Sequence, residues 1–236
     1  MQIGIVGYGK MGRMVEAIAK ERGHSIAFSA GSGDTWSRAD VIIEFTRSEA
    51  VIPNIERAMD QGIPIVTGTT GWKERIEEVT NMVNSKGGSM VHANNFSLGV
   101  NLFYDVSRRL ARAMAPHPDY RAQMEETHHL QKLDSPSGTA ISLAQDLISE
   151  HPAYDRWQNH ESTEQGTLPI ISKREPEVPG THIITWENDI DTIEIKHTAK
   201  NRKGFALGAV VSAEWLIGRS GVFTISDVIG SMNNAL

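Results

Sequence analysis

The sequence predicts an α/β protein in which a doubly wound parallel sheet is joined to a second α+β domain with a mixed or antiparallel sheet. Three observations lead to this prediction. Over the first 96 residues, short apolar segments alternate with amphipathic segments of helical period, the pattern of a parallel sheet with helical crossovers. A glycine-rich turn separates the first two of these segments. Later in the chain, two segments alternate polar and apolar residues with a period of two, as antiparallel strands do.

The elements of the first domain follow from periodicity, in chain order. Gly23 is a plausible stop for the first helix, and Pro53 would have to occupy the first turn of its helix or kink it. The expected strands are residues 2–6, 25–30, 39–45, 63–68 and 89–94, and the expected helices are 13–23, 48–62 and 72–87. Right-handed crossovers would bring the carboxyl ends of the strands to one edge, where ligands bind in such folds.

The second domain is expected to begin near residue 97, where this rhythm changes. The expected strands are 120–126, 181–187 and 191–199, and the expected helices are 98–114, 137–150 and 205–218. Residues 151–180 are rich in Pro, Gly, His and Glu and are predicted to be a loop. We therefore predict a dinucleotide-binding domain over 1–96, a substrate-binding and oligomerisation domain over 97–203, and a C-terminal segment, 204–236, that packs back on the first domain.

Composition narrows the functional class. The 236 residues are 39% hydrophobic and 22% charged, enough to bury a core. A net charge of −6 argues against a nucleic-acid partner or an anionic membrane. The absence of cysteine excludes disulfides, thiolate metal sites and cysteine nucleophiles. The first apolar run is too short for a signal peptide and the longest one is interrupted by Glu214, so we expect a cytoplasmic protein.

The turn GYGKMG has the spacing Gly7-x-Gly9-x-x-Gly12, between an expected strand and an expected helix. The first glycine allows the tight turn, the second lets the backbone approach a pyrophosphate, and the third lets the helix pack on the strand. The helix N-terminus then presents free N–H groups to the phosphates. In this strand–turn–helix context the turn predicts a Rossmann-type dinucleotide site, although a glycine turn needed only for packing is the alternative.

The preference between NADH and NADPH stays open. Such folds often carry an acidic residue at the end of the second strand that binds the ribose 2′-hydroxyl. Gly31 and Ser32 stand at that place, with Asp34 and Arg38 slightly further on. A small neutral loop would leave room for a 2′-phosphate.

The densest polar segment is EETHHLQKLDSPSGTA, residues 125–140. Pro136 fits the first turn of a helix with Ser135 as its N-cap. The N–H groups around the next three residues would then be free to hold an anion, with Lys132 adding a positive charge. Those residues are Ser137, Gly138 and Thr139. The segment therefore predicts a carboxylate or phosphate site.

His128 and His129 lie at the end of the expected strand and can exchange protons near neutral pH. A shared metal ion is the alternative. Adjacent residues on a strand point to opposite faces, which suits one metal poorly, so we expect none.

Taken together, these motifs resemble the dihydrodipicolinate reductase family, also called 4-hydroxy-tetrahydrodipicolinate reductases. The long segment is similar to its signature E-x-H-H-x-x-K-x-D-x-P-S-G-T-A, and EFT, GTTG, ANNFSLGVN and HTAKNRKGFALGAV follow the family in order. The resemblance implies NADH- or NADPH-dependent reduction of a small cyclic dicarboxylate, 4-hydroxy-tetrahydrodipicolinate, to tetrahydrodipicolinate with loss of water, in the diaminopimelate route to lysine. It also implies a homotetramer assembled through the second sheet.

The resemblance also implies residue roles. It makes His128 and Lys132 catalytic, without deciding which donates the proton. Implied substrate contacts are His129, Ser137, Gly138 and Thr139. Implied cofactor contacts are Gly7, Tyr8, Gly9, Lys10, Met11, Gly12, Gly68, Thr69, Thr70, Ala93, Asn94, Asn95 and Phe96.

Two other functions fit parts of the sequence. Dehydrogenases of a semialdehyde or a sugar also join a nucleotide domain to an α+β domain, but they do not need the His-His-x-x-Lys and Ser-Gly-Thr block. A dinucleotide-sensing regulator would need an added DNA- or partner-binding module, against which the acidic charge counts.

Overall fold

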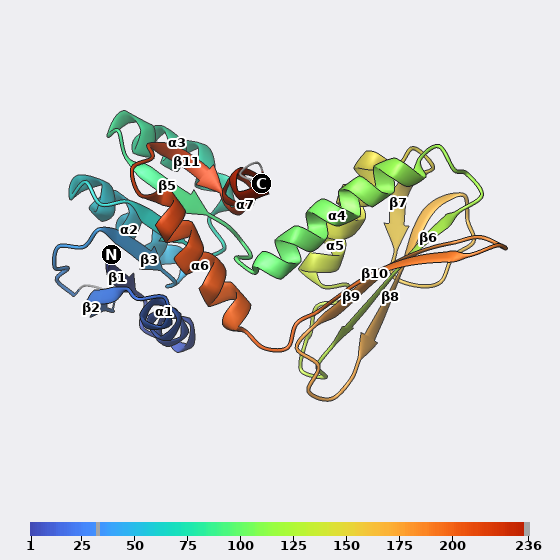
Figure 1. Cartoon of the computed structure of the whole chain (residues 1–236), viewed down its shortest axis with the longest axis horizontal. Helices are drawn as coiled ribbons and strands as arrows, with labels where there is room; N and C mark the ends of the chain where they lie inside the picture. The colour runs from blue at the N-terminus through green and yellow to red at the C-terminus, as the bar shows by residue number, and fades with distance from the viewer. Residues whose placement is uncertain (32–33, 234–236) are drawn as a thin grey trace. The chain divides into compact units, whose positions relative to one another are not determined.

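The computed structural model describes residues 1–31 and 34–233, and the chain divides into two compact units (Figure 1). The first unit combines both ends of the chain, Met1–Asn101 with the segment from Lys203 onward, and the second is Leu102–Arg202. The sequence had suggested divisions at 96/97 and 203/204. Within the described part of the chain, no helix is long and apolar enough to cross a membrane.

The first unit is built on a six-stranded sheet in the order β11-β5-β4-β3-β1-β2. All of its strand pairs are parallel. The strands are β1 (Gln2–Val6), β2 (Ser25–Ala30), β3 (Val41–Glu44), β4 (Ile65–Thr67), β5 (Ser89–His92) and β11 (Gly221–Thr224). The predicted parallel, doubly wound sheet is confirmed, and β11 adds a sixth strand that we did not predict.

Helices cover both faces of this sheet because its residues alternate between two cores. Ile3, Ile5 and Val41 pack with residues of α1 and α6, whereas Val6 and Ile42 pack with residues of α2 and α3. The helices are α1 (Lys10–Glu21), α2 (Ser48–Asp60), α3 (Ile76–Ser85), α6 (Lys203–Leu216) and α7 (Ile225–Asn233), with a 3-10 turn η1 (Lys73–Arg75). Because all neighbouring strands of this sheet are parallel, their carboxyl ends lie at one edge.

The second unit holds a five-stranded mixed sheet in the order β10-β9-β6-β8-β7. β6 runs parallel to β8 and antiparallel to β9, and β9 is antiparallel to β10. The strands are β6 (Arg121–His128), β7 (Tyr154–Gln158), β8 (Gly166–Arg174), β9 (Thr181–Glu187) and β10 (Thr192–Thr198). α4 (Leu98–Met114) and α5 (Gly138–Glu150) share one core with the sheet residues Met124, Ile170 and Ile184.

Two element predictions are wrong. Residues 151–180 are not a loop, because they contain β7 and β8, and β8 buries Leu168 and Ile170 inside the second core. For Pro53, the first of the two alternatives is excluded, because the residue lies inside α2 and not in its first turn. Ser135 is not the N-cap of α5: the helix begins at Gly138, and the Ser137 hydroxyl accepts the N–H of Ala140.

Candidate active site

The glycine turn of the first unit follows β1 and leads into α1. Gly7 has a φ of +91°, and a Cβ there would lie 2.0 Å from the carbonyl oxygen of Phe45. A Cβ on Gly12 would lie 2.3 Å from the carbonyl oxygen of Gly7. Gly9 differs, because a Cβ there would meet nothing within 4 Å. The outer two glycines are thus required by packing, while Gly9 leaves an open space.

α1 presents its N-terminus at this open space. Its N-cap is Gly9, which offers no side chain to the first N–H groups, and no acidic residue lies in the first turn. Lys10 is exposed and Met11 is half-buried. Tyr8 is 40% exposed and its hydroxyl bonds to Glu16. Unpaired N–H groups at the positive end of a helix dipole suit a phosphate.

A buried carboxylate ties the neighbouring loops together. Glu44, at the end of β3, is fully buried and accepts hydrogen bonds from the hydroxyls of Thr67 at 2.5 Å and Thr69 at 3.0 Å. The Thr46 hydroxyl also donates to it, while the Thr46 N–H donates to Thr69 Oγ1 at 2.7 Å. The Thr69 side chain is therefore occupied internally, whereas Thr70 is exposed.

The rest of the predicted cofactor set follows β4 and β5. Gly68 allows close approach of Phe45, since a Cβ there would lie 2.0 Å from that ring. Ala93 and Asn94 come directly after β5. The Asn95 side chain accepts the N–H of Ser97 at 2.9 Å. Phe96 is 1% exposed and its ring belongs to the core.

The region that bears on cofactor preference is partly outside the described residues. Ser32 is one of the residues the structure does not describe. The Gly31 N–H donates to the Asp34 carboxylate at 2.7 Å, and Arg57 donates to the Asp34 carbonyl oxygen at 2.8 Å.

In the second unit, strand directions gather polar residues at one end of the sheet. β6, β8 and β10 all end there and β9 begins there, because β9 runs opposite to the other strands of the sheet. His128 and Arg174 are paired residues at the ends of β6 and β8. Two residues before His128 on β6, Glu126 pairs with His182 of β9. The start of α5 joins the same end, since the Ser137 N–H donates to Glu126 Oε1 at 3.2 Å.

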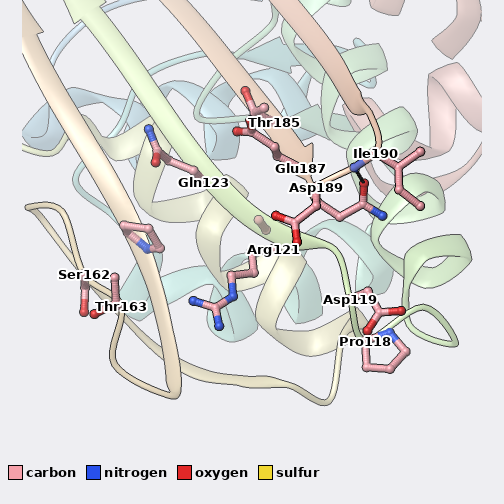
Figure 2. A pocket seen from close by; sticks show the side chains of 13 residues that line it. Pro118, Asp119, Arg121, Gln123, Ser162, Thr163, Thr185, Glu187, Asp189 and Ile190 are labelled. Carbon is pink, nitrogen blue, oxygen red and sulfur yellow. Dashed lines mark hydrogen bonds between the residues drawn. The ribbon is translucent and has the colours of Figure 1, made fainter.

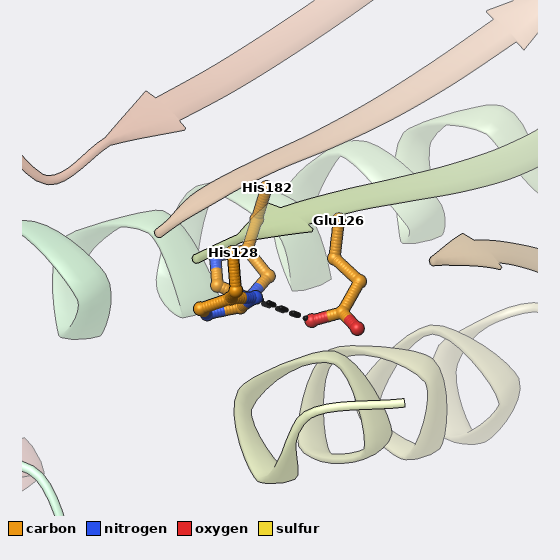
Figure 3. Close-up of side chains that lie close together, drawn as sticks. All are labelled: Glu126, His128 and His182. Atoms are coloured by element: carbon orange, nitrogen blue, oxygen red, sulfur yellow. Dashed lines mark ion pairs between the residues drawn. The ribbon is translucent and has the colours of Figure 1, made fainter. Parts of the chain in front are cut away.

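His128 lies within this end of the sheet, and it is 8% exposed. Its Nδ1 is 2.8 Å from Glu126 Oε2 (Figure 3). His182 stands edge-on to it, with ring centroids 5.1 Å apart. Burial, reinforced by the charge of His128, lowers the pKa of His182 to about 4. His182 is thus neutral at neutral pH.

Lys132 and the turn before α5 converge on a carboxylate. Lys132 Nζ is 2.9 Å from Asp134, and the backbone of Gly138 also bonds to this carboxylate. The hydrogen bond from Lys132 is the main cause that lowers the pKa of Asp134. Thr139 interacts with Tyr104 of α4. Lys132 and Gly138 can therefore hold a carboxylate, although Ser137 differs from expectation because its N–H is already bonded to Glu126.

His129 follows β6 and is half-buried, and its carbonyl accepts the N–H of Lys132 at 3.0 Å. Within the described residues, one group has metal-ligand spacing: Glu126, His128 and His182. The prediction that no metal binds was based on His128 and His129 alone, and this group of three was not foreseen. Its members are already engaged with one another, with Arg174 and with Ser137.

A separate hollow of about 1100 Å³ lies at the opposite end of the same sheet (Figure 2). Arg121, Gln123, Thr185 and Glu187 are among its lining residues. None of the predicted catalytic or substrate residues lines it. The hollow is therefore distinct from the candidate substrate site.

Sequence reasoning missed Glu126, Arg174, His182 and Glu44. A glutamate or arginine in a strand is usually solvent-facing, so no local pattern indicated that these residues take part in a buried polar cluster. The available signal was the spacing of Glu126 and His128, two apart on one strand and hence on one face.

The chain is similar to known proteins over nearly its whole length. The chain matches the family models "Dihydrodipicolinate reductase, N-terminus" over residues 23–96 and "Dihydrodipicolinate reductase, C-terminus" over residues 99–229. It is 44% identical to the 4-hydroxy-tetrahydrodipicolinate reductase of Christiangramia forsetii, over 98% of this chain and 99% of that one. It is 29% identical to the enzyme of that name from Neisseria meningitidis, over 93% and 85%.

A solved structure shares the fold. The dipicolinate-bound dihydrodipicolinate reductase from Paenisporosarcina sp. TG-14 is similar with a TM-score of 0.76 at 22% identity, covering 95% of this chain and 97% of that one. The chain therefore belongs to the dihydrodipicolinate reductase family of NAD(P)H-dependent oxidoreductases, which act on a cyclic dicarboxylate in lysine biosynthesis.

Proposed function

We propose that this chain reduces 4-hydroxy-tetrahydrodipicolinate to tetrahydrodipicolinate, with loss of water, and that the polar end of the second sheet binds and protonates the substrate. The observation that carries the proposal is the convergence of His128, Lys132 and the turn before α5. Lys132 and the Gly138 backbone already hold the carboxylate of Asp134. A dicarboxylate substrate would replace that internal anion with one of its own carboxylates.

The first unit fits a dinucleotide. The open space at Gly9 and the uncapped start of α1 would hold the pyrophosphate, with backbone N–H groups of Lys10 and Met11 as donors. Gly68, Thr70 and the backbone from Ala93 to Phe96 follow β4 and β5 at the same sheet edge. They would contact the nicotinamide end.

When bound, the dihydronicotinamide supplies the hydride that reduces the substrate ring. Loss of the ring hydroxyl as water leaves a conjugated imine. Hydride addition forms a new C–H bond and displaces an electron pair, which must be taken up by a proton. His128 and Lys132 are the groups placed to deliver that proton or to stabilise the charge that develops.

Steady-state kinetics of Lys132→Ala tests these roles. Loss of the ammonium group should lower kcat/KM by about 100-fold or more, while the dissociation constant for the dinucleotide changes little, because Lys132 belongs to the second unit. Arg109→Ala is a matched control, since Arg109 is an exposed cation of the same unit on α4. Unchanged turnover in Lys132→Ala would remove this lysine from the mechanism.

We also propose that the protein is a cytoplasmic homotetramer assembled through the second sheet. α4 and α5 pack on the face that carries Met124 and Ile184, and within the described chain no helix packs on the face that carries Gln123 and Thr185. That face includes the hollow in Figure 2. A sheet that is covered by helices on one face only gains stability by burying its open face.

A further inference from the structure

Glu126 is a fully buried carboxylate at the proposed substrate end, and the proposed reaction gives it no role. It lies two residues before His128 on β6, so both side chains point to the face that carries α4 and α5. Figure 3 shows its carboxylate directed toward His128, with the ring of His182 beside that of His128.

The two carboxylate oxygens contact different parts of the site. Oε2 is 2.8 Å from His128 Nδ1, and apart from this contact neither atom has a hydrogen-bond partner among the described residues. Oε1 accepts the Ser137 N–H at 3.2 Å and Arg174 Nη1 at 3.1 Å. One oxygen therefore faces the proposed acid–base histidine, and the other faces the turn that begins α5.

The charge state of Glu126 decides which nitrogen of His128 carries the proton. Burial alone would raise the pKa of Glu126, but hydrogen bonds from His128, Ser137 and Ser172 outweigh it and hold that pKa well below its usual range. An ionised carboxylate only accepts hydrogen bonds. Nδ1 of His128 therefore carries the proton, and Nε2 is the nitrogen left for proton exchange.

Gly180 borders this remaining nitrogen. A Cβ at Gly180 would lie 3.0 Å from His128 Nε2 and 3.2 Å from the adjacent ring carbon. Its φ of +155° also disfavours a side chain. Glycine at this position therefore keeps the Nε2 side of the ring open.

We propose that Glu126 is the positioning residue of the site. Oε2 fixes the tautomer and orientation of His128, Oε1 fixes the anion-holding turn at the start of α5, and Gly180 keeps Nε2 open. This inference rests on the proposed role of His128. In catalytic triads, a carboxylate likewise bonds to one nitrogen of an imidazole and orients the ring so that the other nitrogen exchanges the proton.

Glu126→Gln separates the two contacts. The amide oxygen still accepts from Ser137, whereas the amide nitrogen donates to Nδ1 and so favours the opposite tautomer of His128. Without its proper tautomer the general acid–base contribution is lost, which lowers kcat by about 100-fold. The dissociation constant of dipicolinate, used as a dicarboxylate probe, should change by less than about threefold because the turn keeps its acceptor.

Nitrogen NMR of histidine-labelled protein gives a readout independent of activity. His128 signals are assigned with His128→Asn, at a pH well above the ordinary histidine pKa. Wild type should carry the proton on Nδ1 and Glu126→Gln on Nε2. Glu125→Gln is the matched control, because Glu125 is the neighbouring strand residue and pairs with Lys173 on the opposite face; it should leave the His128 signals unchanged.

The outcomes separate the two proposals. An unchanged His128 tautomer in Glu126→Gln, or unchanged kcat, overturns the role of Glu126. Full turnover in His128→Asn instead overturns the assignment of His128 in the proposed function. Gly180→Ala supplies a second variant: with folding verified by circular dichroism, it should lower kcat while the proton stays on Nδ1. Wild-type kcat in that variant would contradict the role of Gly180.

Discussion

At the scale of single residues, the least expected feature is a buried polar row at the end of the second sheet. His197, His182 and Glu126 are successive cross-strand partners on β10, β9 and β6. Buried polar groups are costly unless they are paired. The row is stabilised because Glu126 supplies a negative charge among histidines and Arg174.

His182 makes stability depend on pH. Its pKa is about 4 in the folded protein because of burial and the neighbouring His128, against about 6.5 in an unfolded chain. Between these values the unfolded chain binds a proton that the folded protein does not, so stability is lost as the pH falls through this window. From pH 7 to pH 5 this group alone should cost about 2 kcal/mol.

Urea unfolding at the two pH values tests this prediction. His182→Gln removes the titrating group and keeps a polar side chain facing Ser137. The free energy of unfolding should fall less between pH 7 and pH 5 in the variant than in wild type, by about 2 kcal/mol. An equal fall in the free energy of unfolding in both proteins would show that His182 does not cause the pH dependence.

The sequence could identify those residues whose role depends on their neighbours in the sequence. The spacing of Gly7, Gly9 and Gly12 predicted a turn, and the structure gives each glycine a distinct reason. Glu126 could not be identified in this way, because its importance comes from partners on β8, β9 and α5. The family signature includes a glutamate at this position, but the resemblance implied no role for it.

At the scale of elements, the glycine turn with α1 yields a prediction about cofactor binding. A Cβ on Gly9 meets no protein atom within 4 Å, so Gly9→Ala should fold normally while the methyl group intrudes on the pyrophosphate. The dissociation constant of the dinucleotide should rise by about tenfold, as measured by calorimetric titration.

Gly230→Ala provides the matched control. Gly230 lies in α7, a Cβ there also meets nothing within 4 Å, and its φ is not positive. This variant should bind dinucleotide as wild type does. Normal binding by a folded Gly9→Ala protein would remove Gly9 from the pyrophosphate site.

Strands and helices were predictable where their periodicity was sustained and hidden where they were short. Alternation predicted β9 and β10 and their antiparallel pairing. The composition of 151–180 concealed β7, an edge strand with exposed residues, and β8, whose apolar run includes Pro169. The N-cap of α5 lies two residues later than predicted, because the Ser137 hydroxyl, not that of Ser135, caps the helix.

At the scale of the whole molecule, the open face of the second sheet predicts assembly. Light scattering should give a mass of about four chains if this face buries itself between copies. Ile183→Asp places a charge on that face, next to Gln123 and Thr185 in the sheet, and should yield smaller species. Ser149→Asp, on the exposed side of α5, is the control that should keep the wild-type mass. A tetramer that persists in Ile183→Asp would place the interface elsewhere.

The doubly wound class of the first unit was predictable because alternating elements allow few topologies. The elements β11 and α7, which the far end of the chain adds to this unit, were not predictable, because a strand of four residues carries little signal.

The most direct test of the central claim is nicotinamide oxidation with 4-hydroxy-tetrahydrodipicolinate generated in situ, run in parallel with NADH and NADPH. The account predicts substrate-dependent turnover with at least one cofactor, and the ratio of the two values of kcat/KM reports how the segment near Gly31 treats the 2′-position. A folded protein that binds dinucleotide but shows no turnover with either cofactor would contradict the proposed reaction.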